Sequence, residues 1–415
     1  MTSRLLVPPY SVGLEWRIPR RRFASLVLIL TAFMLGACAS SVHVAEPDAG
    51  PTQATGRITD GSRDGTPSAL DDPFNPKFPE PLIDPAEIVS GGPAPDGIPP
   101  IDEPTFEIAA GVDWLEDNEA VLALTIREET RAYPVQIMMW HEIVNDRVGG
   151  VDVAVTYCPL CNSGVAFERA VDGEGILSFG TSGMLYADNL VMYDRQTESL
   201  WPQLTGVASV GVLTGTELTS LPMGAVAWRD FVDAHPDAGV LSRETGVNRS
   251  YGANPYSRYD DPDGDVMFQL PFAVDDRLRV KERVIGITDG ETSLAILRSG
   301  LADNPPMEVT LGSAQLIVWH QPGLASALDA DTVAGGADIG SVGVFNRVVD
   351  GQSLQFDPHD DGFVDRQTGS IWNVLGQATA GPLLGEQLSP HVHLDTFWFA
   401  WAVFHPNSGV VTPGA

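Results

Sequence analysis

Most of the chain after residue 105 consists of short apolar runs separated by turns that contain Gly or Asp. The runs alternate apolar and polar positions or stay apolar over four to seven residues, which is typical of β-strands. The clearest examples cover residues 151–157, 175–179 and 314–319.

Three segments instead predict short helices. Residues 133–144 carry a proline near their start, a position that helices favour for proline. Residues 226–235 and 395–404 also have a helical pattern, and each is halted by the proline that follows it. Because strands dominate and helices are few, we expect an α+β fold that is β-rich.

The chain also repeats its own pattern. The run Asp-Arg-Gln-Thr-Glu-Ser-Leu-Trp at 194–201 returns as Asp-Arg-Gln-Thr-Gly-Ser-Ile-Trp at 365–372. In each copy a tryptophan follows, at Trp228 or Trp398, and a His-Pro pair begins seven residues after it. Spacings this similar predict two related repeat units, a first one with a Cys-x-x-Cys motif and a degenerate second one.

The N-terminal region has the features of a secretory signal. Three arginines at 20–22 precede an apolar run at 23–36, which is shorter than the roughly 20 residues that a membrane span needs. The run ends in Leu-Gly-Ala-Cys, which resembles a bacterial lipobox with Cys38 as the lipidated residue. We therefore expect an extracytoplasmic protein of the cell envelope, anchored to a bacterial membrane through lipid.

These patterns divide the chain into five predicted segments. They are a lipoprotein signal peptide at 1–37, the lipidated Cys38 with a disordered tether rich in Pro, Gly and Asp at 38–104, a first repeat unit at 105–243, an irregular connector at 244–279, and a second repeat unit at 280–415.

The charge restricts the possible partners. The formal net charge is −31, and it becomes −35 without the signal segment, whose five arginines and one glutamate contribute +4. Lysine occurs twice, at Lys77 and Lys281. A surface this negative argues against nucleic acid as a partner. The membrane, reached through the lipid anchor, and a redox partner or small molecule remain as expected partners.

Cys158 and Cys161 form a Cys-Pro-Leu-Cys motif directly after a predicted strand, and they are the cysteines outside the targeting segment. A thiol pair at this spacing can cycle between dithiol and disulfide or share one metal ion. A disulfide between them would stabilise the fold only weakly, because closing a loop of about four residues contributes roughly 2 kcal/mol to stability, whereas closing a loop of 15 residues contributes about 3 kcal/mol. The spacing therefore favours a chemical role over a structural one.

The repeat serves as an internal control for the choice of site residues. Residues found in both units are most simply structural, whereas residues confined to one unit are candidates for function. The second unit has Val-Trp-His-Gln-Pro-Gly at 318–323 in place of the thiol motif, and it lacks a counterpart of residues 140–146. The candidate site is therefore His141, Glu142, Asn145, Asp146, Cys158, Cys161, Asn162 and Ser163.

The chain resembles the domain-of-unknown-function family 3179 over roughly residues 105–412. The runs that carry the resemblance are Arg-Ala-Tyr-Pro at 131–134, Trp-His-Glu-Ile-Val-Asn-Asp at 140–146, Thr-Tyr-Cys-Pro-Leu-Cys-Asn-Ser-Gly at 156–164, the segment 191–201 and the segment 398–406. Some members of that family are selenoproteins, which implies redox chemistry if selenium replaces one of the two sulfurs. The second unit departs from the family motif at the cysteines, and this puts its activity in doubt.

Three hypotheses about function remain open at this point. In the first, Cys158 and Cys161 perform thiol–disulfide or peroxide-type redox work, and a nearby His141 lowers the pKa of the attacking thiol; this hypothesis requires no cofactor. In the second, the same three residues bind copper or zinc. In the third, an inert disulfide lies in a non-catalytic binding module.

Overall fold

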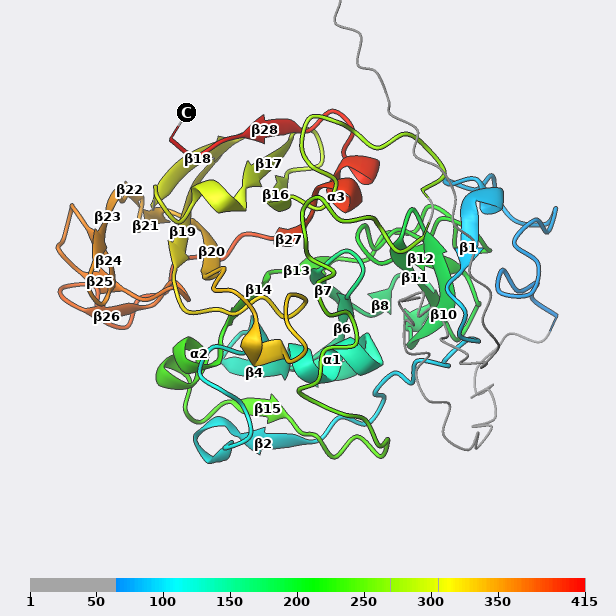
Figure 1. Cartoon of the computed structure of the whole chain (residues 1–415), viewed down its shortest axis with the longest axis horizontal. Helices are drawn as coiled ribbons and strands as arrows, with labels where there is room; N and C mark the ends of the chain where they lie inside the picture. The colour runs from blue at the N-terminus through cyan, green and yellow to red at the C-terminus, as the bar shows by residue number, and fades with distance from the viewer. Residues whose placement is uncertain (1–64, 269, 305, 415) are drawn as a thin grey trace, which may run out of the picture. The chain divides into compact units, whose positions relative to one another are not determined.

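The computed structural model describes residues 65–268, 270–304 and 306–414, all of them within a compact unit that spans 52–415 (Figure 1). The predicted signal peptide and Cys38 lie outside the described residues. Strands outnumber helices in the described part, and this confirms a β-rich α+β fold.

The residues of the first unit, together with β1 from the segment before it, form three main sheets and one small one, with β2 and β4 in cyan and β10 to β12 in green in Figure 1. In the order of their pairing, the strands are β14 (Met223–Ala227), β3 (Ala120–Ile126), β4 (Glu129–Pro134), β15 (Gly239–Leu241) and β2 (Phe106–Ile108); then β13 (Ser220–Leu221), β7 (Ser163–Glu168), β6 (Val151–Cys158) and β5 (Ile143–Val148); then β1 (Ile88–Ser90), β10 (Phe179–Tyr186), β11 (Asn189–Asp194) and β12 (Leu200–Pro202); and finally β8 (Ala170–Val171) with β9 (Gly175–Ile176).

The residues of the second unit form a similar series of sheets. In the order of their pairing, the strands are β27 (His393–Phe397), β16 (Arg283–Thr288), β17 (Ser293–Leu297) and β28 (Gly409–Val411); then β18 (Met307–Leu311), β19 (Ala314–Gln321) and β20 (Ser341–Asn346); then β23 (Phe356–His359), β24 (Gly362–Asp365), β25 (Ile371–Trp372) and β26 (Ala378–Ala380); and finally β21 (Val348–Val349) with β22 (Gln352–Ser353).

The first sheet of each series has the same pattern of pairing. In β14-β3-β4-β15, the first two pairs are antiparallel and the third is parallel. The sheet β27-β16-β17-β28 follows the same order of directions. A short helix follows β14 and β27 alike, α2 (Trp228–Ala234) in one case and α3 (Trp398–Phe404) in the other.

The helix α1 (Val135–His141) lies within the predicted segment 133–144 but is shorter. It ends because Glu142 adopts a left-handed backbone conformation, with φ of 59°, and donates its N–H to the carbonyl of Met138. The chain then enters β5 at Ile143. The remaining short helical turns are η1 (Pro85–Glu87), η2 (Ala109–Gly111), η3 (Arg298–Gly300) and η4 (Val333–Gly335).

The expectation of a disordered tether is wrong for residues 65–104. Strand β1 pairs with β10, and Ala69 and Ile101 are buried in apolar clusters. The N–H of Ile101 donates a hydrogen bond to β5, and the carbonyl of Ile101 accepts one from β5. These two bonds hold the segment against the first unit. Pro and Gly in this segment therefore shape an ordered covering layer. In the predicted connector 244–279, the described residues form no helix or strand.

One apolar cluster draws on both units. It contains Val155 and Phe167 from the first unit and Phe397, Trp398 and Trp401 from the second, all of them buried. Strand β6 is buried from Val153 to Cys158 and is flanked by β5 and β7. The end of β6, where the thiol motif begins, is therefore deep inside the protein.

Candidate functional site: a buried thiol turn

The two cysteines belong to the tight connection between β6 and β7. Cys158 pairs with Ser163 at the end of the ladder, so residues 159–162 make the turn and Cys161 lies within it. Asn162 closes the turn with φ of 50°, a conformation that asparagine tolerates better than most residues. We call residues 158–163 the thiol turn. A strand follows it, so no helix N-terminus is present to stabilise a thiolate.

Both cysteines are free thiols and both are buried, with 1% of Cys158 and none of Cys161 exposed. The Cys161 sulfur lies 3.2 Å from the Ser163 hydroxyl oxygen and 3.8 Å from the Cys158 carbonyl oxygen. Burial raises the pKa of the Cys161 thiol well above its usual range, and the neighbouring Cys158 thiol raises it further. Cys161 is therefore protonated near neutral pH.

A string of polar side chains leads away from Cys161. The Ser163 hydroxyl donates to Gln203 Oε1 at 3.0 Å, and Gln203 Nε2 donates to Thr156 Oγ1 at 2.9 Å. The Thr156 hydroxyl in turn donates to the carbonyl of Val165. All of these side chains are buried, so the sulfurs border a hydrogen-bonded polar string rather than a purely apolar interior.

The second unit also holds the thiol turn. The carbonyl of Cys161 accepts hydrogen bonds from the Thr396 hydroxyl at 2.8 Å and from the Phe397 N–H at 3.1 Å. Both donors lie at the end of β27. The position of Cys161 therefore depends on residues that are more than two hundred positions away in the chain.

His141 is engaged elsewhere. Its Nδ1 lies 2.7 Å from the carbonyl oxygen of Pro99, and its Nε2 lies 2.6 Å from the Tyr251 hydroxyl. Burial lowers the pKa of His141 to about 4, so the ring is neutral at pH 7. Neither ring nitrogen is left for a sulfur, and the prediction that His141 activates a thiol gains no support from this geometry.

Glu142 lies beside the thiol strand, since its carbonyl accepts the N–H of Tyr157 at 2.8 Å. Burial raises the pKa of its carboxyl group to about 8, which leaves it uncharged near neutral pH. Burial raises the pKa of Tyr256 above its usual range, and the charge that Glu142 acquires on ionisation raises it further, as do charges on Cys158 and Asp188.

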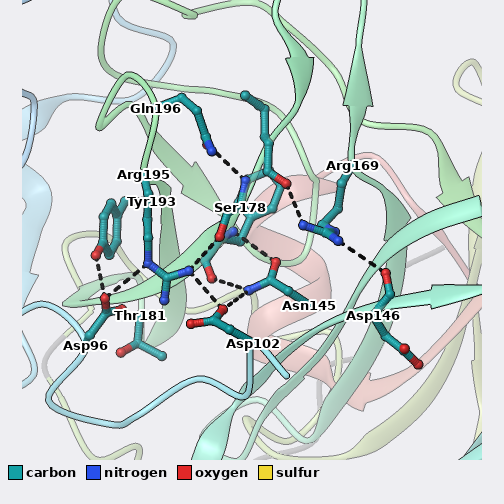
Figure 2. A network of polar contacts seen from close by, with 12 residues as sticks. Asp96, Asp102, Asn145, Asp146, Arg169, Ser178, Thr181, Tyr193, Arg195 and Gln196 are labelled. Carbon is teal, nitrogen blue, oxygen red and sulfur yellow. Dashed lines mark hydrogen bonds and ion pairs between the residues drawn. The ribbon is translucent and has the colours of Figure 1, made fainter. Parts of the chain in front are cut away.

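Asn145 and Asp146 belong to a different network, which Figure 2 shows from close by. Asn145 Nδ2 donates to Asp102 Oδ1 at 2.7 Å, while Asp146 Oδ2 accepts the Tyr133 hydroxyl at 2.6 Å. Arg195 completes the network, with Nη1 2.9 Å from Asp102 Oδ1. The bonds to Asp102 attach the segment before β2 to the first unit, and the bond between Asp146 and Tyr133 joins β5 to β4, so their observed role is in positioning the chain.

Asn162 lies at a small cavity beside the thiol turn. The cavity has a volume of about 40 Å³ and also touches Tyr157, Arg283, His393 and Asp395. The Tyr157 hydroxyl donates to Asn162 Oδ1 at 3.2 Å. A volume of this size holds a few water molecules, since one water needs about 10–15 Å³ of such space.

Sequence reasoning missed Gln203, Thr156 and Asp188. The repeat could have identified the first two, because the residues of the second unit that align with Gln203 and Thr156 are Val374 and Trp319. Asp188 lies in the turn between β10 and β11, where a single acidic residue in a hairpin carries no distinctive pattern. The Asp188 carboxyl group accepts a hydrogen bond from the hydroxyl of Tyr259, which lies 3.0 Å away in the connector.

The described residues contain no group of three or more His, Cys, Asp or Glu side chains placed to hold a metal ion. No helix within the described ranges is long and apolar enough to cross a membrane.

The fold and the site together define a β-rich protein with a buried Cys-x-x-Cys turn. Residues 95–408 match the model of the family described as protein of unknown function, DUF3179. The match covers more than half of the chain, and the protein belongs to this family. No curated protein and no solved structure matches the chain.

Proposed function

We propose that this protein is a thiol–disulfide exchange protein of the cell envelope, with Cys158 and Cys161 as its redox couple. The observation that carries the proposal is the pair of neighbouring free thiols in one tight turn, joined to the buried polar string of Ser163, Gln203 and Thr156. A pair kept for packing alone would need no such string. Cys38, through its lipid, would hold the protein at the membrane.

The roles of the two sulfurs follow from their surroundings. Cys161 is fully buried and its thiol has a raised pKa, so it is the resolving cysteine. Cys158 precedes it at the end of β6 and is the attacking cysteine. Because both are covered, exchange requires the thiol turn or its cover to open, and we expect slow reaction with small disulfides in the closed protein.

The proposed reaction balances as follows in the oxidising direction. The Cys158 thiolate attacks a disulfide of a protein or small molecule, whose S–S bond breaks; one half leaves as a thiolate and takes up a proton. Cys161 then loses its proton and attacks the Cys158 sulfur of the mixed disulfide. The Cys158–Cys161 bond forms, and the second half leaves and is protonated, so the partner gains two electrons and two protons.

We also infer that the two units arose by duplication and that the second unit performs no thiol chemistry. The equal order and direction of pairing in the sheets β14-β3-β4-β15 and β27-β16-β17-β28 support this inference. The strand β19, in the place of β6, ends at Gln321 instead of a cysteine. Through Thr396 and Phe397, the second unit would act as a support for the thiol turn.

The test is a redox titration of the full-length protein. The protein is equilibrated with graded ratios of reduced to oxidised dithiothreitol, quenched with acid, unfolded and labelled with a maleimide, and the labels are counted by mass. We expect Cys158 and Cys161 to lose their labels together in one two-electron transition. A Cys38→Ser variant separates any contribution from the third cysteine.

Persistence of two free thiols at every ratio, even after prolonged equilibration, would refute the proposal. The matched control is Cys158→Ser combined with Cys161→Ser. It should fold with a melting temperature within a few degrees of the wild type, because a hydroxyl at 161 can still bond to Ser163 and to the carbonyl of residue 158. Loss of folding would show that the pair has a structural role.

A further inference from the structure

The amide group of Gln203 can have only one orientation in its buried site. Its nitrogen, Nε2, lies 2.9 Å from the Thr156 hydroxyl oxygen and 3.3 Å from the carbonyl oxygen of Ser163. A carbonyl oxygen can only accept a hydrogen bond, and the Thr156 hydroxyl already donates its hydrogen to the carbonyl of Val165 at 2.8 Å. Both neighbours therefore need a donor, which places the amide nitrogen on their side and the amide oxygen on the side of the Ser163 hydroxyl.

This orientation fixes the direction of the hydrogen bond between Ser163 and Gln203. The amide oxygen, Oε1, lies 3.0 Å from the Ser163 hydroxyl oxygen and carries no hydrogen, so Ser163 donates its one hydroxyl hydrogen to it. Gln203, Thr156 and Ser163 have no exposed surface, so these bonds are shielded from bulk water. The Ser163 hydroxyl therefore has only its oxygen lone pairs left for a further neighbour.

The neighbour that faces these lone pairs is the sulfur of Cys161, 3.2 Å from the Ser163 hydroxyl oxygen. Oxygen lone pairs repel a thiolate and accept a hydrogen bond from a thiol, so the S–H of Cys161 is the donor in this contact. The carbonyl oxygen of Cys158, 3.8 Å from the same sulfur, also requires the thiol form. The direction of the polar string thus holds Cys161 protonated, in addition to the effect of burial.

The second unit has the serine and lacks the amide. In the ladder of β19 and β20, Ser341 occupies the place that Ser163 has in the ladder of β6 and β7. The Ser341 hydroxyl lies 3.3 Å from Asp230 Oδ2, and the residue that aligns with Gln203 is Val374. A serine at this place is compatible with either unit, whereas the amide occurs in the unit that contains the cysteines. The amide is therefore the part of the string that is specific to the thiol site.

We propose that Gln203 is a positioning residue for the resolving step: by taking the hydrogen of Ser163, it keeps Cys161 as a thiol and prolongs the life of the mixed disulfide. The inference rests on the proposed function, since it concerns the second exchange step. In that step the S–H bond of Cys161 breaks and its proton passes to a base of the solvent. The thiolate then forms the S–S bond with Cys158, and the partner's sulfur leaves with the electron pair of the broken S–S bond and is protonated.

The first experiment measures the resolution rate of a mixed disulfide with glutathione. Full-length protein with Cys38→Ser reacts with glutathione disulfide and is quenched with acid at intervals, and the adduct and the Cys158–Cys161 disulfide are separated by mass. In Gln203→Leu and Gln203→Met, no strong acceptor competes for the hydrogen of Ser163, which can then donate to the Cys161 thiolate. We expect resolution at pH 7 to be roughly tenfold to a hundredfold faster than with Gln203, because hydrogen bonds to charged groups are the stronger kind.

The pH dependence of resolution is a readout that a purely structural role of Gln203 would not change. The rate should rise with pH as Cys161 ionises, and the rise should begin at lower pH in Gln203→Leu, because the freed hydroxyl of Ser163 stabilises the thiolate. Burial and the charges on Cys158 and Asp188 raise the pKa of Cys161, and these groups are the same in all the variants at residue 203.

Three controls separate this role from a general loosening of the thiol turn. Gln203→Leu should give no gain in rate when it is added to Ser163→Ala, since no hydroxyl remains to donate, whereas a loosened turn would react faster with or without Ser163. Gln203→Glu keeps an acceptor for the Ser163 hydroxyl and should resolve the adduct no faster than the wild type. Ser341→Ala, the matched change in the second unit, should leave the rate unchanged.

A second experiment leaves Gln203 in place and covers the case in which the variants at residue 203 do not fold. The S–H stretching band of Cys161 in the Raman spectrum of the reduced protein, identified by its loss in Cys161→Ser, reports whether this thiol donates a hydrogen bond. We expect the band to move to higher frequency in Ser163→Ala, which lacks the acceptor. An unmoved band would show that the thiol does not donate to Ser163 and would refute the proposal.

The outcomes separate the two proposals. If the wild type never forms the Cys158–Cys161 disulfide, the proposed function fails, and the role of Gln203 in resolution fails with it, whatever the Raman band shows. If the disulfide forms and Gln203→Leu resolves the adduct no faster than the wild type, or gains equally with and without Ser163, the role of Gln203 alone is refuted.

Discussion

The two copies of Asp-Arg-Gln-Thr share their local structure and differ in their surroundings. Asp194 accepts the N–H of Thr197 at 2.6 Å and Trp201 Nε1 at 3.0 Å, and Asp365 accepts the equivalent groups, the N–H of Thr368 and Trp372 Nε1, at the same two distances.

The arginine that follows behaves differently in the two copies. Arg195 is 6% exposed and lies between Asp96 and Asp102, whereas the side chain of Arg366 is 57% exposed and pairs with Asp357 at the surface. The segment before β2 covers the first copy, and Arg366 has no such covering partner. The comparison shows that the turn itself is encoded locally, while the role of its arginine depends on what packs over it.

The same contrast applies to the connections after β6 and β19. Residues 159–162 connect β6 to β7 as a tight turn that contains a cysteine. The longer segment 322–340 connects β19 to β20. At the facing positions, the polar Thr156 and Gln203 of the first unit correspond to Trp319 and Val374, which pack in an apolar cluster. Shared strand pairing thus supports a polar thiol site in one unit and an apolar core in the other.

The largest expected effect tests the shared turn. Replacing Asp194 or Asp365 with alanine removes the acceptor of several buried donors, so each change should lower the free energy of unfolding by about 3 kcal/mol. Denaturant unfolding of both variants measures this. If only one of the two variants were destabilised, the two turns would not be equivalent despite their matching hydrogen bonds.

The second prediction tests the difference between the arginines. Arg195→Ala leaves Asp96 and Asp102, which are partly buried, without their cation, and it should cost about 2 kcal/mol of stability. Arg366→Ala removes an exposed pair and should leave the unfolding curve essentially unchanged. Equal destabilisation by the two changes would contradict the role given to the covering segment.

The third prediction concerns the pH dependence of stability. The pKa of Glu142 is raised by burial to about 8, so between pH 6.5 and 8 the folded state keeps a proton that the unfolded state has released. Stability should therefore fall as pH rises, by up to about 1.4 kcal/mol per pH unit for this group. Glu142→Gln should flatten the curve.

The range from pH 6.5 to 8 excludes the contribution of His141 to the pH dependence of stability, which has the opposite sign. The pKa of His141 is lowered to about 4, so its buried neutral ring makes stability rise with pH below about 6.5, where the unfolded histidine is protonated. Glu386→Gln, on an exposed residue of the second unit, provides the control. An unchanged slope in Glu142→Gln would show that this carboxyl group is ionised in the folded protein.

Much of the fold could be predicted from local pattern. Strands β6 and β19 and helices α2 and α3 follow from apolar runs bounded by turns or proline. The strand expected at 175–179 is broken instead, because the N–H of Leu177 bonds to the carbonyl of Arg169 and the Ser178 carbonyl accepts the N–H of Arg195. The order of residues 65–104 could not be inferred, because it depends on distant partners such as β10 and Ile143.

The candidate site was predictable in part for the same reason. Cys158, Cys161 and Ser163 are neighbours in sequence, so their proximity follows from the turn. Thr396 and Phe397 reach the thiol turn through tertiary packing, which no local pattern encodes. His141 and Asn145 share the sequence neighbourhood of Glu142, but their side chains bond to Pro99 and Asp102.

The bond from Thr396 to the Cys161 carbonyl has a consequence for biosynthesis. Thr396 comes 235 positions after Cys161 in the order of synthesis, so the turn acquires its last hydrogen bonds when the chain is almost complete. Until then the Cys161 carbonyl lacks both of its donors from β27. The nascent polypeptide must therefore carry a thiol turn without this support through most of its synthesis, and a premature stop before residue 393 would leave it so.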